Sequence, residues 1–432
     1  MHTVAAAIRR DTGFKIAQSL VFNDPDSRYL TRGVTADGNR TAFTFSFWAK
    51  KNNEAGNTGN QNIFVGNGGN DSDNRDFLRF AGSDRLQSRT LELGAIKQDK
   101  VTTENLKDSS AWMHILWVWD TNNGNNSDRI RLYKDNVRFV DFDSSSNPSS
   151  GYGSRRINRS SRDMSIGRDL SSVGAEADFY MAEVVFLDGS VLDPSSFGED
   201  DGNGNWVPID VSGLDYTGVN SFHLDFSDPN NIGNDVSGNG IHYTPVNFLS
   251  SHVVTDSPTN NIATIDSSRV STLALDGNRL WTRGGDDYIH LTTAIMGSGK
   301  WYFEAKVESN PSSDMRVGVF KVGSYESSRL GDQADCYGYR SDGTTRFNGG
   351  SAAYGDIWQT VGDVIGVAFN NIDMTIEYFK NGVSQGVANT GLPVGDYYFS
   401  WSGDITDVNL FMRFNSDNFT YAPPAGFKEL KN

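Results

Sequence analysis

Apolar and polar positions alternate at period two along much of the chain, which indicates strands. The segment TAFTFSFWAK (41–50) places three phenylalanines on one face and Thr, Ser and Trp residues on the other. This alternation is typical of a strand buried on one face. The segment AWMHILWVWD (111–120) is apolar on both faces, which predicts a central strand covered on both sides. No long stretch repeats at the helical period of about 3.6, so the pattern predicts an all-β fold.

Strand candidates recur through the second half of the chain about every 10–15 residues, with turn residues between them. They are residues 300–308, 316–320, 336–350, 362–370, 396–403 and 408–415. Short strands at regular spacing are typical of β-sandwiches and jelly rolls. We therefore predict two antiparallel β-sandwich domains in tandem, of the jelly-roll, lectin-like type.

Composition suggests where these domains begin and end. The length of 432 residues is compatible with two to four domains of ordinary size. The segment DSPTNN (256–261) combines Pro with small polar residues and is the best linker candidate. We place an N-terminal arm at 1–15, a first sandwich with its closing segment at 16–255, a linker at 256–266 and a second sandwich at 267–432.

Two segments have the pattern of a β-hairpin, one in each predicted domain. They are IRLYKDNVRFV (130–140) and IEYFKNGVSQG (376–386), and each has an aromatic residue and a Lys before a turn pair followed by Val. The turn pairs are Asp135-Asn136 and Asn381-Gly382, residue types that tolerate the positive φ of tight hairpin turns. Neither segment contains a plausible catalytic set, so we interpret the similarity as repeated architecture.

Charge and cysteine content exclude several classes of protein. The formal net charge of −16 makes the chain a poor partner for nucleic acid or an anionic membrane. No apolar run reaches the roughly 18 residues of a membrane span, and the N-terminus lacks the order of an export signal. The single cysteine, Cys336, excludes an intramolecular disulfide framework and fits cytosolic assembly. We predict no nucleic-acid partner and no membrane insertion.

Carboxylate pairs are the strongest candidates for catalytic chemistry, because glycoside hydrolases need two carboxyl groups about 5–10 Å apart. Glu183 and Asp188 lie five residues apart, on opposite faces of a strand. Asp141 and Asp143 share a face, but an Asp pair after a hairpin is usually solvated. His114 has no Ser, Cys or second His near it in sequence, which favours a core histidine. We predict that the protein is not an enzyme.

Metal and cofactor patterns are weak. The six histidines show no tight spacing, and Cys336 has no neighbouring His. Asp clusters at 23–27, 70–76 and 198–205 could supply oxygen ligands to Ca²⁺, but none has EF-hand spacing and polar turns are the favoured interpretation. We predict no catalytic site, no metal and no cofactor.

A family resemblance covers about 150 residues of the second block. Its carriers are GSGKWYFEAKV, VGVF, YGYRSDGTTRFNGG, GDVIGVAFN, IEYFKNGVSQG and FTYAPPAGFKEL, in that order. Together they resemble a SPRY domain, which implies a bent antiparallel β-sandwich used for recognition. One departure is NNIDMTIEYF, where the family would have a more acidic turn.

The first block resembles concanavalin A-like or laminin-G-like sandwiches through FTFSFWAK, AWMHILWVWD, RIRLYKDNVRF and FYMAEVVFLDGSVLDPSSFGE. With FHLDFSD and DVSGNGIHYTP between the two blocks, nearly the whole chain resembles virion structural proteins of tailed bacteriophages. That resemblance implies a non-enzymatic tail-fibre or adhesin component that recognises host-surface glycans, located in the virion and assembled in the bacterial cytoplasm. The first alternative is a capsid-surface decoration or head-fibre protein, and the second is a polysaccharide-degrading enzyme.

Sugar binding by such a protein would use loop aromatics with planar polar groups beside them. The loop aromatics include Trp206, Tyr216 and Trp281. The ligand-binding candidates are Arg340, Asp342, Arg346, Tyr354, Trp358 and Trp401. A packing or turn role for each of them stays open.

A virion role also implies particular partners. They are copies of the same chain, with a trimer favoured, other virion proteins, and a host-cell-surface glycan. The N-terminal arm is a candidate virion anchor through Ala5, Ile8, Arg9 and Arg10, and a frayed terminus is the alternative.

Overall fold

The computed structural model describes residues 13–23, 26–52, 59–67, 72–171, 176–265, 273–275, 280–282, 289–324, 329–403 and 408–432. The chain divides into two compact units. The first covers Met1–Lys51 and Asn57–Asn260, and the second is formed mainly by Asn261–Asn432. Strands and short 3₁₀ turns are the regular elements of the described residues, which confirms the predicted all-β class with tandem antiparallel sandwiches. The part of the chain that is described contains no helix long and apolar enough to cross a membrane.

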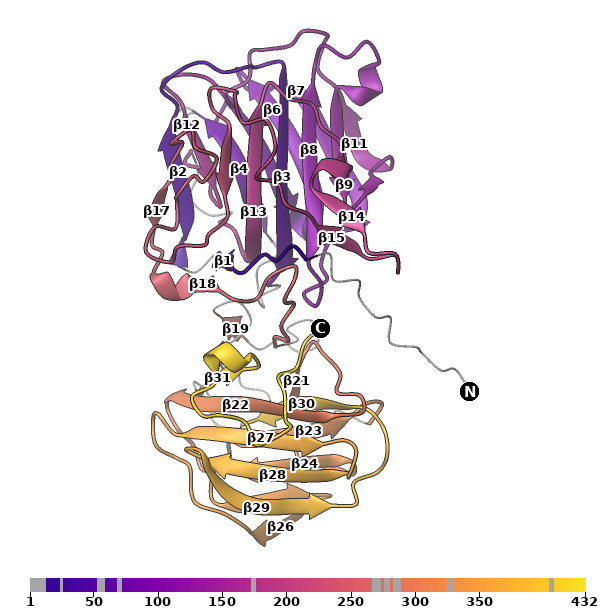
Figure 1. Ribbon diagram of the computed structural model, residues 1–432, viewed down its shortest axis with the longest axis vertical. Coiled ribbons are helices and arrows are strands. Elements are labelled where there is room, and N and C mark those ends of the chain that lie inside the picture. Colours follow the sequence, from indigo (N-terminus) through magenta and orange to yellow (C-terminus); the bar gives the residue numbers. More distant parts are fainter. Residues whose placement is uncertain are drawn as a thin grey trace. The chain divides into compact units, whose positions relative to one another are not determined.

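The N-terminal unit packs two large antiparallel sheets against each other (Figure 1). The strand order of sheet A is β10 (Val137–Arg138), β9 (Ile130–Lys134), β8 (Met113–Asp120), β3 (Ala42–Lys51), β13 (Phe179–Asp188), β1 (Ser19–Val21) and β18 (Val253–Val254), with β16 (Phe222–Leu224) also paired to β13. The order of sheet B is β11 (Phe142–Ser146), β7 (Ala95–Asn105), β6 (Arg85–Glu92), β5 (Arg75–Ala81), β4 (Gln61–Asn67), β12 (Asp163–Ile166), β2 (Tyr29–Gly33) and β17 (Thr244–Val246). A small ribbon joins β14 (Gly198–Asp200) to β15 (Trp206–Pro208).

Sheet A is covered on both faces, which corrects the prediction for β3. Its three phenylalanines enter the core between the sheets, as the alternation predicts. The other face of the sheet is also buried, because apolar residues between 192 and 216 pack over β8 and β13. The polar residues of β3 are satisfied there: Thr44 donates to the carbonyl of Ser190, and Ser46 lies 2.8 Å from Nε2 of His114. The polar residues of β3 alternate with apolar ones as in a strand with one face in solvent, but here their partners are buried.

The N-terminal unit is closed by its own last strand. β18 pairs with β1, near the beginning of the unit. Asp256, just beyond β18, accepts a hydrogen bond from the buried ammonium of Lys50 (2.7 Å) and another from Nε1 of Trp112 (2.9 Å). A buried lysine without a counter-charge would be costly, so the Lys50–Asp256 pair ties the end of the unit to β3.

The C-terminal unit is a second sandwich (Figure 1). The strand order of sheet C is β19 (Leu273–Leu275), β20 (Leu280–Thr282), β31 (Asn409–Arg413), β22 (Lys300–Ser309), β27 (Val364–Asn370), β28 (Thr375–Lys380) and β29 (Val383–Thr390). The order of sheet D is β21 (His290–Leu291), β30 (Tyr397–Ser402), β23 (Arg316–Lys321), β24 (Cys336–Arg340), β25 (Thr344–Phe347) and β26 (Gly350–Ala353). Aromatic and aliphatic residues of both sheets fill the space between them.

Both predicted hairpins are present. β9 pairs with β10 at an edge of sheet A, and β28 pairs with β29 at an edge of sheet C. Asp135 has φ 53° in the first turn, and Asn381 and Gly382 have φ 50° and 79° in the second. Turn residues that accept positive φ therefore mark both hairpins, as the sequence pattern indicates.

The second hairpin gives a prediction about Gly382. A Cβ atom at this position would lie 2.5 Å from Cδ1 of Tyr421, whereas a Cβ atom at Gly386, also at positive φ, would meet nothing within 4 Å. We expect Gly386→Ala to lower the free energy of unfolding by about 1–2 kcal/mol, from positive φ alone. Gly382→Ala should cost at least about 1 kcal/mol more, because overpacking adds to the strain. Urea unfolding followed by circular dichroism measures both, and equal losses would contradict the close contact.

Candidate interaction surface

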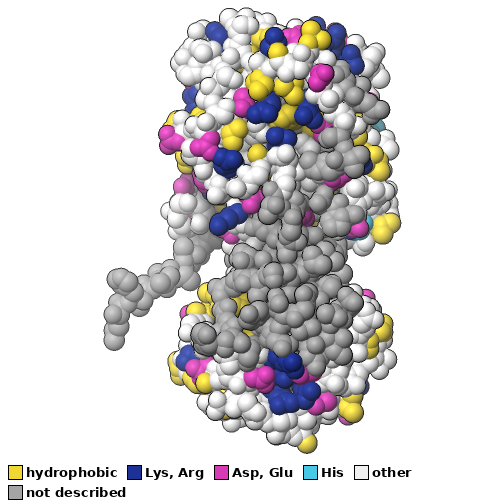
Figure 2. Space-filling model, turned by 180° about the vertical axis from the view of Figure 1, so that it is seen from behind, with side chains coloured by type: hydrophobic (Ala, Val, Ile, Leu, Met, Phe, Trp, Pro, Cys, Tyr) yellow, Lys and Arg dark blue, Asp and Glu magenta, His cyan; other side chains and the backbone are white. Residues whose placement is uncertain are grey.

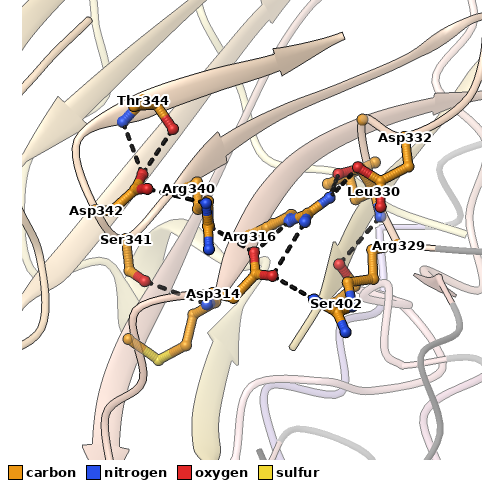
Figure 3. A network of polar contacts seen from close by, with 12 residues as sticks. Asp314, Arg316, Arg329, Leu330, Asp332, Arg340, Ser341, Asp342, Thr344 and Ser402 are labelled. Carbon is orange, nitrogen blue, oxygen red and sulfur yellow. Dashed lines mark hydrogen bonds and ion pairs between the residues drawn. The ribbon is translucent and has the colours of Figure 1, made fainter. Parts of the chain in front are cut away.

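A buried carboxylate is the centre of a polar network at one end of sheet D (Figure 3). Asp314 precedes β23, and Arg316 is the first residue of that strand. Oδ1 of Asp314 lies 2.6 Å from Nε of Arg316, and Oδ2 lies 3.1 Å from Nη2, so the two side chains pair through two parallel bonds. Each side chain is only 3% exposed. Such bidentate pairs have a fixed geometry, which makes this centre rigid.

Two further arginines reach the same carboxylate from other segments. Arg340, at the end of β24, places Nε 2.7 Å from Oδ1 of Asp314, and Arg329 bonds Oδ2. Figure 3 shows the three guanidinium groups directed at this one carboxylate. Arg316 also contacts Asp332 (2.7 Å), and Arg340 contacts Asp342 (3.0 Å). Three arginines thus face three aspartates, and their formal charges cancel.

The arginines hold Asp314 in its ionised form. Burial by itself would raise the pKa of this carboxyl, but the hydrogen bonds and charges of Arg316, Arg340 and Arg329 outweigh burial and leave the pKa below its ordinary value. The pKa of Arg316 is raised in turn by Asp314 and Asp332, against the opposing effect of burial. The centre of the network therefore stays charged at neutral pH.

Serine hydroxyls extend the network to the backbone. Ser341 donates to the carbonyl of Ser312 (2.6 Å) and accepts the amide N–H of Met315 (3.2 Å). The amide of Leu330 donates to Oγ of Ser402, the last residue of β30 (3.0 Å). Segments that are distant in sequence are thus held together by side chains rather than by strand pairing alone.

The outer members of the network reach solvent. The side chains of Arg329 and Arg340 are 28% and 19% exposed, and those of Asp332 and Asp342 are 32% and 30% exposed. We call these four residues the charged rim. Its groups are already ordered by the buried centre, so a ligand that binds them would not have to immobilise them.

The predicted ligand-binding residues divide into two groups. The structure brings Arg340 and Asp342 together in the charged rim, and Arg346 of β25 lies on the same sheet, opposite Gly338 of β24. Trp358 and Trp401 are completely buried in the core of the unit, where neither offers a face to a ligand.

Tyr354 has an internal role. Its hydroxyl donates to the carbonyl of Gly386 and accepts the amide N–H of Tyr378, so it bridges β28 and β29 where their register shifts. The ring of Tyr354 packs edge-to-face on the buried Tyr339, with ring centroids 5.2 Å apart. The hydroxyl takes the place of a direct backbone hydrogen bond between β28 and β29, which explains why a tyrosine occupies this position.

The other predicted residues lie elsewhere. Trp206 donates from Nε1 to Nδ1 of the buried His114 (3.3 Å), and Tyr216 is buried beside His223. The side chain of Trp281 lies outside the described residues, as do the proposed anchor residues Ala5, Ile8, Arg9 and Arg10. Self-association, with a trimer favoured, stays a prediction.

Sequence reasoning missed Asp314, Arg316 and Arg329. Asp314 and Arg316 are two residues apart at the start of a strand, which places their side chains on the same face and was the available signal. Arg329 lies in a segment that has no strand pattern, so its partner could not be inferred from spacing.

The carboxylates considered for hydrolysis have different partners. Oε2 of Glu183 lies 2.8 Å from Nε2 of His223, and both residues are more than 90% buried. Glu183 has φ 47° at a register shift within β13, which is unusual for a residue in the middle of a strand. Asp188 accepts hydrogen bonds from the side chain of Asn158 and the amides of Asn39 and Asn220. The two carboxylates therefore bind different internal partners.

Two observations concern metal and thiol chemistry. Within the described ranges, no group of three or more His, Cys, Asp and Glu side chains is placed to hold a metal ion. Cys336 is buried, and its thiol donates to the carbonyl of Gln333 (3.0 Å). Burial raises the pKa of this thiol, which lowers the fraction of reactive thiolate.

The order of motifs and the sandwich agree with one known family. The profile of the SPRY domain family matches residues 300–400. The C-terminal region contains a SPRY domain. The SPRY domain of human HERC1 is similar in structure, with a TM-score of 0.31 and 18% identity over 34% of this chain and 96% of that domain.

Two relatives in sequence are eukaryotic proteins. Ran-binding protein 9 of Xenopus tropicalis is 37% identical over 118 residues, which are 26% of this chain and 21% of that protein. The E3 ubiquitin-protein ligase RKP of Arabidopsis thaliana is 28% identical over 145 residues, or 32% of this chain and 11% of that protein. The chain therefore spans about a fifth or less of the length of these relatives.

These relatives overturn the phage interpretation. The expected tail-fibre or adhesin function and the virion location are wrong, because the SPRY domain matches Ran-binding proteins and a plant ligase. The resemblance to phage virion proteins depended on the first block and the SPRY block occurring together. The specific motifs, however, lie in the SPRY domain alone. The concanavalin A-like or laminin-G-like assignment of the first block stays a prediction.

The buried centre predicts a large effect of one substitution. Asp314→Asn would leave three arginines facing a neutral amide, and breaking a buried ion pair in this way costs roughly 3–5 kcal/mol. Asp342→Asn, at the half-exposed rim, should cost less than about 1 kcal/mol. Urea unfolding monitored by tryptophan fluorescence compares the two. Equal costs would show that Asp314 is not the organising charge.

The Glu183–His223 pair predicts a pH dependence. Burial alone would lower the pKa of His223, but the hydrogen bond and charge of Glu183 raise it above the ordinary value of 6.5. A raised pKa in the folded state stabilises the protein below about pH 6.5, and this stabilisation is lost as the pH rises through the folded pKa. We therefore expect the free energy of unfolding to fall as the pH rises above about 6.5.

The control is His223→Gln, which cannot titrate and should flatten this part of the profile. Glu183→Gln removes the charge that raises the pKa and should flatten it too. Urea unfolding at pH 6, 7 and 8 measures the three slopes. The same slope in the wild type and in His223→Gln would assign the pH dependence to other groups.

Proposed function

We propose that this protein is a non-enzymatic binding protein whose SPRY domain recognises other proteins through the charged rim. The observation that carries this proposal is the rim itself, because its four partly exposed charged groups are held directly or through one neighbour by the buried Asp314–Arg316 pair. Pre-ordered polar groups reduce the entropic cost of binding and favour specific partners. Catalysis needs a reactive group held near a base or a metal. Glu183 is instead paired with His223, and the thiol of Cys336 donates to the carbonyl of Gln333.

The named relatives support a binding role. The name of Ran-binding protein 9 states that this relative binds Ran, and the Arabidopsis relative is named as a ubiquitin ligase, a class of enzyme that must select protein substrates. The similarity to these two relatives extends over 26% and 32% of this chain, so it concerns a domain-sized segment rather than the whole protein. We propose for this chain the capacity to bind a protein segment and leave the partner to experiment.

A second surface provides a contrast within the same domain. Ile295, Val322, Ile372 and Val394 are between 38% and 81% exposed. They lie beside the ends of β23 and β30 that are farther from the charged rim. There the amide of Val322 donates to the carbonyl of Asp396, and the side chain of Asn371 donates to the carbonyl of Met296. We call these four residues the aliphatic end. Exposed aliphatic side chains that gather in this way can also contact a protein.

A displayed random-peptide library, selected on the full-length protein, tests the proposal. We expect the selection to give a recurring peptide motif. The affinity of that peptide should fall at least tenfold when Arg329→Ala and Asp342→Ala are combined, because the loss of two contacts of ordinary strength weakens binding by about 1.4 kcal/mol or more. Val394→Glu, at the aliphatic end, is the matched control and should leave binding unchanged. Circular dichroism and thermal unfolding verify that each variant is folded.

Two results would reject the charged rim. One is a library that yields no recurring motif. The other is a motif whose binding survives the double substitution but is lost with Val394→Glu, which would place the contact at the aliphatic end.

A further inference from the structure

A row of arginines crosses the outer face of sheet B in the N-terminal unit. Arg75 and Arg79 lie on β5 on either side of Phe77, and Arg89 of β6 is directly opposite Phe77. Side chains two residues apart on a strand share a face, so these residues lie together on one surface. Seen from behind, the N-terminal unit shows Lys and Arg side chains gathered around hydrophobic ones (Figure 2).

Two of the three arginines have a carboxylate partner. Arg89 pairs with Asp99 through two bonds, Nε to Oδ1 at 2.9 Å and Nη2 to Oδ2 at 3.0 Å. Arg75 pairs with Asp169, and the side chain of Asn67 donates to the same carboxylate (2.8 Å). Arg75 and Arg89 are therefore each held in place by an aspartate.

Arg79, which lies two residues beyond Phe77 on β5 and opposite Gln87 of β6, is different. Its Nε donates to Oε1 of Gln87 at 2.8 Å, and among the residues that the structure describes no carboxylate contacts its guanidinium group. The carbon of the guanidinium lies 4.5 Å from the centre of the Phe77 ring. The ring attracts the flat face of the cation but leaves the N–H edge unsatisfied. The two terminal nitrogens of Arg79 are thus available as a pair of donors.

The surroundings of Arg79 disfavour its charge. Burial is the main cause, and it lowers the pKa of Arg79 to about 10 together with the charges of Arg89 and Arg75. The charges of Asp99 and Asp169 raise this pKa but do not outweigh the other effects. A bound anion would supply the negative charge that this position lacks. Guanidinium groups bind planar oxyanions through two parallel hydrogen bonds, as Arg89 does with Asp99 in the same row.

We propose that Arg79 is the centre of an oxyanion-binding site on sheet B, which takes a carboxylate as its preferred ligand. The terminal nitrogens of Arg79 donate to the two oxygens, and Arg75 and Arg89, each held by its own aspartate, lie on the same face of the sheet. The site lies in the N-terminal unit and does not depend on the binding role proposed for the SPRY domain. A carboxylate can come from an acidic side chain or a small metabolite, and a phosphate group shares the oxyanion chemistry.

Nuclear magnetic resonance of the arginine Nε–H groups in the full-length protein tests the site. Acetate and inorganic phosphate are titrated separately at constant ionic strength. We expect one arginine signal to shift in a saturable way, with acetate binding tighter than phosphate. Phosphate binding at least tenfold tighter than acetate would overturn the carboxylate preference. A linear, non-saturating response to both anions would overturn the site itself.

Two substitutions assign the signal. Arg79→Gln should abolish the saturable response, and Arg79→Lys, which keeps the charge but loses the planar fork, should weaken binding at least tenfold. Arg138→Gln is the matched control, because Arg138 lies on β10 of sheet A, is partly exposed and pairs with Asp128. It should leave binding unchanged. Retention of the response in Arg79→Gln would overturn the assignment.

Stability measurements provide a readout that does not require the bound anion. Without added oxyanion, Arg79→Gln should have a melting temperature equal to or above that of the wild type, because a cation that shares a face with two other cations has been removed. A simple structural role for Arg79 predicts the opposite, namely a clear fall in melting temperature at every anion concentration, and that result would overturn the proposal.

Discussion

The charge of Asp314 in the interior of the SPRY domain is the constraint on which its charged rim depends. Taking a carboxylate out of water costs several kcal/mol, and only well-placed partners recover that cost. The partners come from β23, β24 and the segment that contains Arg329, so the carboxylate is stable only when all three are in place. The surface segments around it therefore form as one assembly, and the exposed charges inherit the rigidity of the buried one.

The fold could be predicted well wherever the determining interaction is local. The turn at Asn381 and Gly382 needs residues that accept positive φ, and that requirement is visible in the sequence itself. The strand pattern and the order of the SPRY motifs extended this local information to a whole domain. Alternation in β3 was less reliable, because Thr44 and Ser46 look like solvent-facing residues but bond to buried partners.

The candidate site could be predicted only in part. Arg340 and Asp342 were found because they are neighbours in a conspicuous polar segment. Asp314 was missed although its spacing from Arg316 was a usable signal, and its second partner, Arg340, is on another strand that no spacing rule connects to it. Trp358 was misjudged for a related reason: it follows a polar loop in sequence, yet the sandwich closes over it completely. Burial of a single side chain depends on contacts between distant segments, and those contacts are not visible in the pattern of one segment.

The closure of the N-terminal unit by β18 has a consequence for biosynthesis. The hydroxyl of Ser19 donates to the carbonyl of Asp256, a residue 237 positions further along the chain. A nascent chain that has not yet released residues 253–256 from the ribosome has β1 without one neighbour and Lys50 without its counter-charge. Contacts of such long sequence separation form late and slowly. The N-terminal unit can therefore complete its fold only after almost all of its own length has been translated, and until then β1 has an open edge of the kind that can pair with other chains.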